Sequence, residues 1–466
     1  MQLLNMECVN PSKQRLLWTV LWLVLPAFII GCNRPKTVHD VFEKGMQEVN
    51  SGDWNAAITD FTQIIELEPK NGPAYDNRAT AERRLKEYDK AMSDYNQAIE
   101  INPKDDYAYL GRGLTRYEKG DYDNAITDYL YAIQLNRTNA AAYFELGLVN
   151  YRLTNLDDAI TNFTRAVELG DNLPGVYTFL GRVNYKNGNT EAAIIDFNKA
   201  IELEPKDDFI YQNRGQAKYK SGDFDGAITD YNRSIELNST NGSAYEDLGL
   251  AKYKKGDIDG AIADYGKAIR LNPKDVHAYD ARGLAKRKSG DIDGALTDYN
   301  QAIKLDPQYN LAYINRGSAR LKKGDLDGAI ADYNKVIELN PTNAIAYNDR
   351  GWAEFRKSDF DASIADATHA IQLNPTNSYA YGTRGWARYG KGDISGAVED
   401  CKIAVKLSQP DSFQSFYDQG MIDFIAGDYA KAIEDWQKVI QKDAASKVEL
   451  QPWIDKAQAK LPEKKP

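Results

Sequence analysis

A Gly-Asp doublet recurs along the chain at separations that are multiples of 34 residues. The copies that keep both residues are Gly52-Asp53, Gly120-Asp121, Gly222-Asp223, Gly256-Asp257, Gly290-Asp291, Gly324-Asp325 and Gly392-Asp393. Degenerate doublets fill the missing positions, and one inserted residue near Gln409 moves the last copy to Gly427-Asp428. A fixed period of this length indicates stacked copies of one supersecondary unit, because a single unit cannot bury its own apolar face. The sequence therefore predicts twelve units over residues 38–446, beginning with residues 38–71 and ending with residues 378–412 and 413–446.

Each unit has the pattern of two helices joined by a short turn. From Tyr211 to Lys220, larger and small residues occupy helical spacing, and Gly222 then ends the helix in the left-handed region. Asp223 or Asp225 is placed to cap the second helix, whose apolar residues lie on one face. The expected fold class is all-α.

The units resemble the tetratricopeptide repeat (TPR), and the resemblance covers nearly the whole chain. The small residue of the family's first helix is matched by Gly45, Ala79, Gly113, Gly147, Gly181, Gly215, Gly249, Gly283, Gly317, Gly351, Gly385 and Gly420. We expect small residues there because two helix backbones cross closely and a larger side chain would overpack the contact. The resemblance implies a right-handed superhelical α-solenoid of about twelve 34-residue helix–turn–helix repeats. A last helix over Val448 to Leu461, within a capping segment of residues 447–466, covers the final repeat.

Two departures from the family pattern predict polar contacts between helices. Arginine replaces the usual leucine of the first helix at Arg78, Arg112, Arg214, Arg282, Arg316, Arg350 and Arg384. In the second helix of eleven units, an aspartate precedes the usual aromatic position, as at Asp60, Asp94, Asp128, Asp196, Asp230, Asp264, Asp298, Asp332, Asp366, Asp400 and Asp435. We expect Arg–Asp pairs that form a structural ladder and favour one stacking register. The alternative is that these arginines bind an anion.

The N-terminus has the pattern of a targeting segment. Lys13 and Arg15 precede an uncharged run from Leu16 to Ile30, which is shorter than the roughly 20 residues of a spanning helix. The sequence that ends in Cys32 resembles the lipobox of bacterial lipoproteins. That resemblance implies a signal peptide over residues 1–31, lipidation of Cys32 and a tether over residues 32–37. The alternative is an uncleaved signal anchor; both predict a membrane-anchored protein of the bacterial cell envelope that faces the periplasm or the cell exterior.

Composition disfavours several functional classes. A net charge of -10 argues against nucleic-acid binding, and three dispersed histidines with three cysteines argue against a metal site or a disulfide framework. The D-x-D-G pattern at Asp223-Asp225, Asp257-Asp259, Asp291-Asp293 and Asp325-Asp327 is similar to part of a calcium loop. A third ligand before the glycine and a closing glutamate are missing, so helix caps are the better interpretation. With no catalytic motif or domain, we expect neither an enzyme nor a cofactor, metal or small-molecule substrate. Cys401 is expected to be a packed thiol.

A row of tyrosines near the end of the first helix is the candidate binding surface. Its members are Tyr117, Tyr151, Tyr185, Tyr219 and Tyr253, and the next position is often basic, as at Lys186, Lys220, Lys254, Lys288 and Lys322. In the TPR family the first helices line a concave groove that holds peptides. Tyrosine and lysine together suit an acidic or C-terminal peptide segment. The alternative is that the rings pack between helices and the lysines are solvated.

The expected function is a non-enzymatic protein–protein interaction scaffold, anchored to a bacterial membrane, that helps assemble envelope complexes. Its partners would be other proteins or peptides. One alternative is an adaptor that recruits a hydrolase of envelope polymers, and another is an enzyme.

Overall fold

A computed structural model describes residues 37–170 and 173–461 of the chain. Within these residues the chain forms 25 α-helices and one 3₁₀ helix, which confirms the all-α prediction. The predicted signal peptide, Cys32 and the rest of the tether up to residue 36 lie outside the described residues. The first helix begins after Thr37, whose hydroxyl accepts a hydrogen bond from the backbone of Asp40.

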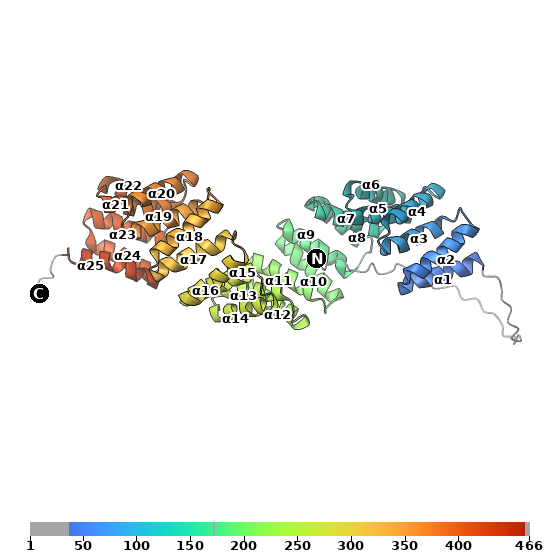
Figure 1. The fold of residues 1–466 in the computed structure, drawn as a ribbon, viewed down its shortest axis with the longest axis horizontal. Helices are drawn as coiled ribbons and strands as arrows, with labels where there is room; N and C mark the ends of the chain where they lie inside the picture. Colours follow the sequence, from blue (N-terminus) through green and yellow to red (C-terminus); the bar gives the residue numbers. More distant parts are fainter. Residues whose placement is uncertain (1–36, 171–172, 462–466) are drawn as a thin grey trace. The chain divides into compact units, whose positions relative to one another are not determined.

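The chain divides into two compact units, Met1–Arg137 and Thr138–Pro466. In the first unit the helices are α1 (Val38–Ser51), α2 (Trp54–Leu67), α3 (Gly72–Arg84), α4 (Tyr88–Ile101), α5 (Asp106–Lys119) and α6 (Tyr122–Leu135). Figure 1 shows them as successive helix pairs. Each odd-numbered helix is the first helix of a repeat and each even-numbered one the second.

The second unit holds the other helices, again in pairs (Figure 1). They are α7 (Ala140–Arg152), α8 (Leu156–Glu168), α9 (Pro174–Lys186), α10 (Thr190–Leu203), α11 (Asp208–Ser221), α12 (Phe224–Leu237), α13 (Gly242–Lys255), α14 (Ile258–Leu271), α15 (Val276–Ser289), α16 (Ile292–Leu305), α17 (Asn310–Lys323), α18 (Leu326–Leu339), α19 (Ala344–Arg356), α20 (Phe360–Leu373), α21 (Ser378–Lys391), α22 (Ile394–Leu407), α23 (Phe413–Ala426), α24 (Tyr429–Lys442), the 3₁₀ helix η1 (Ala444–Ser446) and α25 (Lys447–Gln458).

The turn inside each repeat depends on a residue in the left-handed region. Gly222 ends α11 at a φ of 88°, and the Asp223 side chain then accepts a hydrogen bond from the backbone of Gly226 in α12. In three repeats Lys86, Thr154 and Ser358 stand in place of this glycine and adopt φ values of 64°, 65° and 63°. The repeat geometry therefore imposes the turn even where a side chain disfavours it.

The small residue of the first helix faces an aromatic ring, which corrects the reason given above for its size. A Cβ on Gly113 would lie 2.6 Å from the ring of Tyr129, and one on Gly215 would lie 2.6 Å from the ring of Tyr231. These rings come from the second helix of the same repeat and are fully buried. Close approach of a helix backbone occurs at Gly351, where no ring lies opposite and a backbone oxygen is 3.3 Å away.

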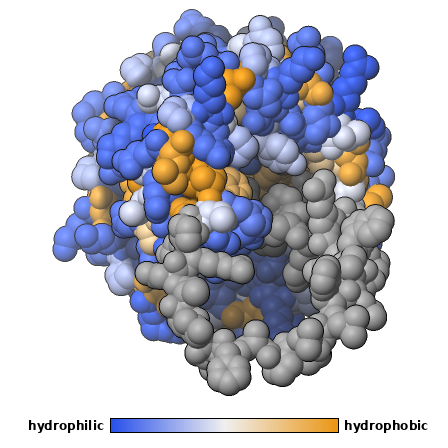
Figure 2. Space-filling view, turned by 90° about the vertical axis from the view of Figure 1, so that its right-hand side faces the viewer, coloured by the Kyte–Doolittle hydropathy of each residue, from blue (hydrophilic) through white to orange (hydrophobic). Residues whose placement is uncertain are grey.

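The last helix, α25, packs against α24 through Leu450, Ile454 and Ala457. It begins at Lys447 and ends at Gln458, so the predicted span from Val448 to Leu461 is correct to within three residues. Trp453 joins the aromatic cluster of the final repeats, as a capping helix requires. The face in Figure 2 is mostly hydrophilic, with hydrophobic residues in small separate groups. Among residues 37–170 and 173–461, no helix is long and apolar enough to cross a bilayer.

Candidate functional site

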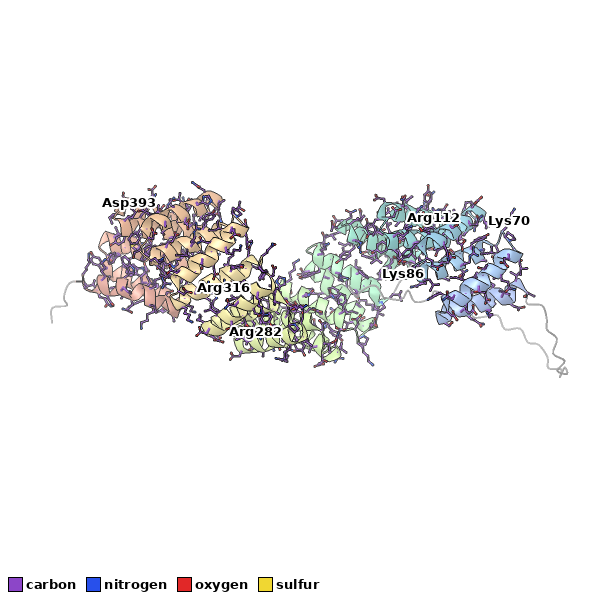
Figure 3. All side chains as sticks on the ribbon, viewed as in Figure 1. Lys70, Lys86, Arg112, Arg282, Arg316 and Asp393 are labelled. Carbon is purple, nitrogen blue, oxygen red and sulfur yellow. The ribbon has the colours of Figure 1, made fainter. Side chains whose placement is uncertain are left out.

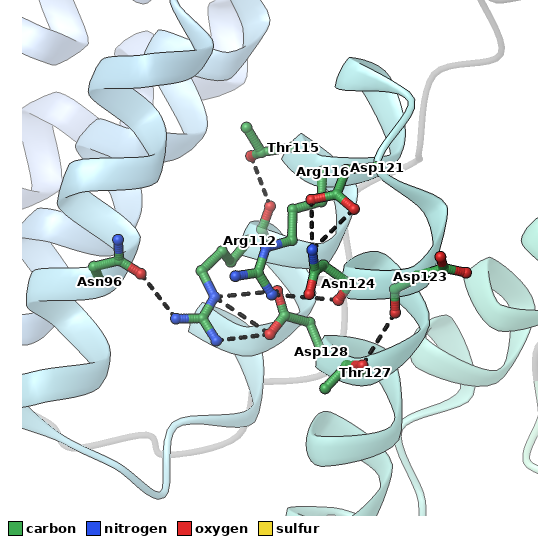
Figure 4. A network of polar contacts seen from close by, with 10 residues as sticks. Asn96, Arg112, Thr115, Arg116, Asp121, Asp123, Asn124, Thr127 and Asp128 are labelled. Carbon is green, nitrogen blue, oxygen red and sulfur yellow. Dashed lines mark hydrogen bonds and ion pairs between the residues drawn. The ribbon is translucent and has the colours of Figure 1, made fainter.

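The predicted Arg–Asp pairs form, and they join the two helices of seven repeats. In α5, Arg112 donates from Nη2 to Asp128 Oδ1 at 2.7 Å and from Nη1 to Asn96 of the preceding repeat at 2.8 Å (Figure 4). Arg116 adds a second cation 2.6 Å from Asp128 Oδ2, and the carboxylate is fully buried. The same pairing recurs at Arg78–Asp94, Arg214–Asp230, Arg282–Asp298, Arg316–Asp332, Arg350–Asp366 and Arg384–Asp400. The ladder prediction is confirmed.

The arginines of the ladder have little capacity left for an anion. Nε, Nη1 and Nη2 of Arg112 all donate to Asp128 or Asn96, and its guanidinium lies 5.4 Å from the Tyr109 ring. Arg316 is held in the same way by Asp332, Asn300 and the ring of Tyr313 (Figure 3). This geometry favours the structural role over anion binding.

The ladder is interrupted where leucine replaces the arginine. Leu180 is one such position, and Asp196 of that repeat accepts instead from Asn184 Nδ2 at 2.8 Å. Burial then raises the pKa of Asp196 to about 6. In the repeat with Leu248, Lys252 holds Asp264 Oδ2 at 2.6 Å and Lys267 lies 3.6 Å from Oδ1.

The aspartates of the D-x-D-G pattern are helix caps and ion-pair partners. The first aspartate of each copy accepts from the glycine N–H three residues later, at 2.9–3.0 Å. In three copies the second aspartate forms an ion pair with a lysine of the next repeat, as in Asp293–Lys323 at 2.6 Å and Asp327–Lys357 at 2.5 Å. In the described part of the chain no three His, Cys, Asp or Glu side chains are grouped to hold a metal ion. The caps account for the pattern.

The tyrosine and lysine rows meet across neighbouring repeats. The lysine ammonium of one repeat lies over the tyrosine ring of the repeat before it, at 5.2 Å for Lys186 over Tyr151, 4.7 Å for Lys220 over Tyr185 and 4.6 Å for Lys288 over Tyr253. The rings are partly buried and the lysines exposed. Each of the two interpretations given above is therefore correct in part. The tyrosine rings pack within the chain, and the lysine side chains that lie over them remain exposed at the surface.

The remaining members of the two rows are placed in a similar way. Tyr117, in the first unit, packs 5.5 Å from the Tyr122 ring, and Tyr219 packs 5.3 Å from Phe224. Lys254 and Lys322 are exposed at the ends of α13 and α17.

Carboxylates form a second row on the first helices that sequence reasoning missed. They lie two or three positions before the small residue, at Asp76, Glu246, Asp247, Asp280 and Asp349. Amides hold three of them: Gln212 and Gln216 donate to Asp247 at 2.8 and 2.9 Å, Asn315 donates to Asp280 at 2.9 Å, and Asn348 donates to Asp349 at 3.0 Å. Desolvation by burial raises the pKa of Asp76 to about 7, of Glu246 to about 8 and of Asp349 to about 6.

These carboxylates stand apart from the cations of the ladder. Within the described residues, no lysine or arginine forms an ion pair with any of the five. Near neutral pH the row is therefore only partly ionised, because burial holds Asp76 and Glu246 partly or largely protonated, and no ion pair with a cation of the described residues stabilises its charged form. No periodic signal reveals the row, because it skips repeats and alternates between two positions.

The last three repeats and α25 enclose a cavity of about 170 Å³. Its aromatic walls are Trp352 of α19, Tyr379 and Trp386 of α21, and Phe413 and Tyr417 of α23. Asp349 and Glu449 bring carboxylates to the same cavity. Four of the chain's seven tryptophans fall in this region: Trp352, Trp386, Trp436 and Trp453. This concentration of tryptophan is the sequence feature from which the cavity could have been predicted.

Polar groups around this cavity are strongly desolvated. Asp418 lies behind it and accepts from Gln414 at 2.6 Å and Trp386 at 3.2 Å, and burial raises its pKa to about 7. Burial likewise raises the pKa of Glu449 above its usual range, although Arg356 lies 3.8 Å away. Cys401 is fully buried beneath Gly385, which confirms the packed thiol, and burial raises its thiol pKa.

Comparison with known proteins supports the repeat assignment. A family model described as TPR repeat matches residues 79–120, 113–153, 181–222, 215–256 and 251–290. A second, described as Tetratricopeptide repeat, matches residues 281–344, 317–378 and 383–447. No curated protein matches the sequence.

Several solved structures are similar in fold. YrrB, described as "a TPR protein with an unusual peptide-binding site", is 23% identical with a TM-score of 0.38, covering 40% of this chain and 97% of its own. Yeast Tom70 is 16% identical with a TM-score of 0.41, covering 91% of this chain and 96% of its own. The Cut9–Hcn1 hetero-tetramer of the APC/C contains a chain that is 13% identical with a TM-score of 0.45, covering 90% of this chain and 96% of its own. With tandem helix pairs on the 34-residue period and family matches along most of residues 79–447, the chain belongs to the tetratricopeptide repeat family.

Proposed function

We propose that the protein is a non-enzymatic scaffold that binds partner proteins on the surface of its first helices. The observation that carries this proposal is the contrast between two sets of polar groups. The Arg–Asp ladder is satisfied within the chain, whereas the carboxylate row at Asp76, Glu246, Asp247, Asp280 and Asp349 is not paired with cations of the described residues. An unpaired, desolvated carboxylate is costly to ionise, so a partner that supplies a positive charge would favour the ionised form of these groups and be held by it.

The charge of this row favours a basic partner segment. The lysine row alone suggested an acidic peptide, but Lys186, Lys220 and Lys288 already lie on tyrosine rings. A cation above an aromatic face is attracted by the ring quadrupole, which reduces what these lysines offer an incoming carboxylate. We therefore expect lysine- or arginine-rich segments of partner proteins to bind.

A membrane anchor at Cys32 completes the proposal. The support is the sequence alone: a basic start, a short apolar run and a cysteine in the lipobox position. Lipidation would hold the repeats at a bacterial membrane, facing the periplasm or the exterior, where they would assist assembly of envelope complexes. The Cys32→Ser variant is expected to lose a lipid-sized mass increment; an unchanged increment would contradict lipidation at this residue.

Crosslinked affinity capture from intact membranes tests the binding surface. The variant Tyr219→Ala/Lys220→Glu/Tyr253→Ala/Lys254→Glu disrupts the row, and Glu246→Gln/Asp247→Asn removes charge from the carboxylate row beside it. Lys206→Glu/Lys274→Glu is the control, since both lysines lie in exposed turns between repeats. We expect a protein captured by wild type and control to be lost from the row variants while circular dichroism shows them folded. A partner retained by both row variants would place binding elsewhere, and a captured polymer hydrolase would favour the adaptor alternative.

A further inference from the structure

We infer that the cavity formed by α19, α21, α23 and α25 binds the side chain of a lysine presented by a partner protein. The inference rests on the proposed function, because it names one residue of the segment that the scaffold would hold. It depends on three features of the cavity: aromatic walls, carboxylates without a full set of partners, and a buried hydroxyl that makes no hydrogen bond.

The aromatic walls suit a cation with an apolar stem. Trp386 lies 4.8 Å from the Tyr417 ring, and Trp352 lies 5.9 Å from the same ring at 74°. Aromatic side chains that converge in this way attract an ammonium group through their electron-rich faces. They also pack against the methylene groups of a lysine stem.

Two polar groups of the cavity are acceptors that make no hydrogen bond in the described structure, whereas the amides and hydroxyl of Asn348, Gln414 and Thr383 donate to neighbouring groups of the chain. The Tyr417 residue is 4% exposed, and in the described structure its hydroxyl makes no hydrogen bond. Glu449 Oε1 also lacks a hydrogen-bond partner there, since the Arg356 Nε atom is 3.8 Å from it. A buried polar atom without a partner costs about 1–3 kcal/mol, so a ligand that donates hydrogen bonds would recover part of that cost.

The size and the arrangement of acceptors favour lysine over arginine. A cavity of about 150 Å³ accommodates a six-atom ring such as benzene, and the present cavity of about 170 Å³ has room for the five heavy atoms of a lysine side chain. Asn348 already donates to Asp349 Oδ1 at 3.0 Å. A guanidinium binds best to a carboxylate that offers both oxygens, whereas an ammonium donates singly to separate acceptors.

The last helix is part of the site. Glu449 comes from α25, outside the twelve repeats, and the other lining residues come from the first helices of three successive repeats. The equivalent positions of the preceding repeat hold different residues: Asn315 in place of Asp349, and Ser318 in place of Trp352. The combination of residues that lines this cavity is therefore specific to the C-terminal end of the chain.

Saturation-transfer NMR on the full chain tests the inference with three peptides. The probes are Ac-Gly-Ala-Lys-Ala-Gly-NH2 and its norleucine and arginine counterparts. Norleucine keeps the stem of lysine and removes the charge. We expect the lysine peptide to bind at least about fivefold more tightly than the norleucine peptide, as an interaction of roughly 1 kcal/mol requires. The arginine peptide is expected to bind more weakly than the lysine peptide.

Matched variants locate the binding. Asp349→Asn/Glu449→Gln is expected to abolish the preference for lysine over norleucine. Asp259→Asn/Glu191→Gln, the same two changes at exposed carboxylates outside the cavity and outside the carboxylate row, is expected to leave it intact. Circular dichroism checks that each variant is folded.

The outcomes separate the inference from the proposed function. Equal binding of lysine and norleucine peptides, tighter binding of the arginine peptide, a preference that survives in the double variant, or no peptide binding would each overturn the lysine pocket. The scaffold proposal is judged independently, by whether the membrane capture yields a partner that depends on the first-helix rows.

Discussion

At the scale of single residues, the structure shows side chains that are retained at a cost to stability. Thr154 occupies the left-handed turn position that glycine fills in most repeats, and its φ is 65°. Asp76 carries a buried carboxylate oxygen that makes no hydrogen bond within the described structure. Such costs are largest for β-branched residues at positive φ and for charged groups removed from water.

Replacing Thr154 with glycine is expected to stabilise the α7–α8 pair. A non-glycine residue in the left-handed region costs roughly 1–2 kcal/mol, partly offset by the greater freedom of glycine in the unfolded chain. We expect a net gain of about 0.5–1 kcal/mol in the opening free energy of these helices, measured by native-state hydrogen exchange. Gly222→Thr is the reverse control and should lower the protection of α11 and α12. Loss of protection in Thr154→Gly would contradict the strain argument.

Replacing Asp76 with asparagine is expected to stabilise the first unit more at pH 8 than at pH 5. Burial raises the pKa of Asp76 from 3.8 to about 7, so the folded state holds more protons than the unfolded state between these pH values. The free energy of unfolding that this group contributes therefore falls as pH rises from about 4 to 7. We expect asparagine to recover about 1–3 kcal/mol at pH 8, seen as a higher Tm.

The pH dependence of the gain is the decisive observation for Asp76. The exposed Asp259→Asn change is the control for loss of a negative charge. A gain from Asp76→Asn that is equal at pH 5 and pH 8 would show that the effect does not come from ionisation of this carboxylate.

At the scale of elements, seven helix pairs are joined by an Arg–Asp pair of the ladder, and in most helix pairs a ring of the second helix packs against a glycine of the first. Asp298 is 2% exposed and is held by Arg282 at 2.6 Å and Lys286 at 2.8 Å. The chain itself contains a version without the arginine, in which Leu248 replaces it and Lys252 and Lys267 pair with Asp264 at 2.6 and 3.6 Å. Lysines are thus sufficient to keep a buried aspartate paired in this fold.

The ladder is expected to respond non-additively to loss of its cations. Arg282→Leu should lower the opening free energy of α15 and α16 by only about 1 kcal/mol, since Lys286 remains as the partner of Asp298. Arg282→Leu/Lys286→Met leaves the buried carboxylate without a cation and should cost about 3–5 kcal/mol. Hydrogen exchange of these two helices measures both effects. Additive losses from the two single changes would show that either cation acts independently.

At the scale of the whole molecule, stability is built from neighbour contacts, because within each unit a repeat touches the repeats next to it. Arg112 reaches Asn96 of the preceding repeat, and Lys323 reaches Asp293. The final repeat lacks a following repeat, and α25 covers it with Leu450, Trp453 and Ile454.

Truncation after Asp443 is expected to destabilise the C-terminal end locally. Removing α25 exposes Trp436 and Phe424, which lie 6.4 and 5.8 Å from the Trp453 ring. We expect faster exchange in α23 and α24 and unchanged exchange in α11 and α12, because coupling decays from repeat to repeat. Truncation after Leu461 is the matched control. Uniform loss of protection across the second unit would contradict a nearest-neighbour description.

The sequence by itself determined the repeat, its helix pairs and the ladder. These features recur on a fixed period, so the same residue types appear at the same positions of successive repeats. The pair Arg282–Asp298, for example, occupies the positions of Arg112–Asp128. The caps at Asp223 and its equivalents were readable for the same reason. The proposed lipid anchor at Cys32 also comes from the sequence and stays a prediction.

Only the tertiary structure decided which residues of different repeats meet. Lys220 lies on Tyr185 rather than on the adjacent Tyr219, because stacking brings the end of one first helix onto the preceding one. The cavity with Trp352, Asp349 and Glu449 joins three repeats and the last helix. Trp352 recurs on the period as Trp386 and Asp349 as Asp247, but Glu449 lies outside the repeats, so the period does not reveal the combination. A periodic pattern reveals what copies share, whereas a binding site depends on how unlike residues of neighbouring copies are brought together by packing.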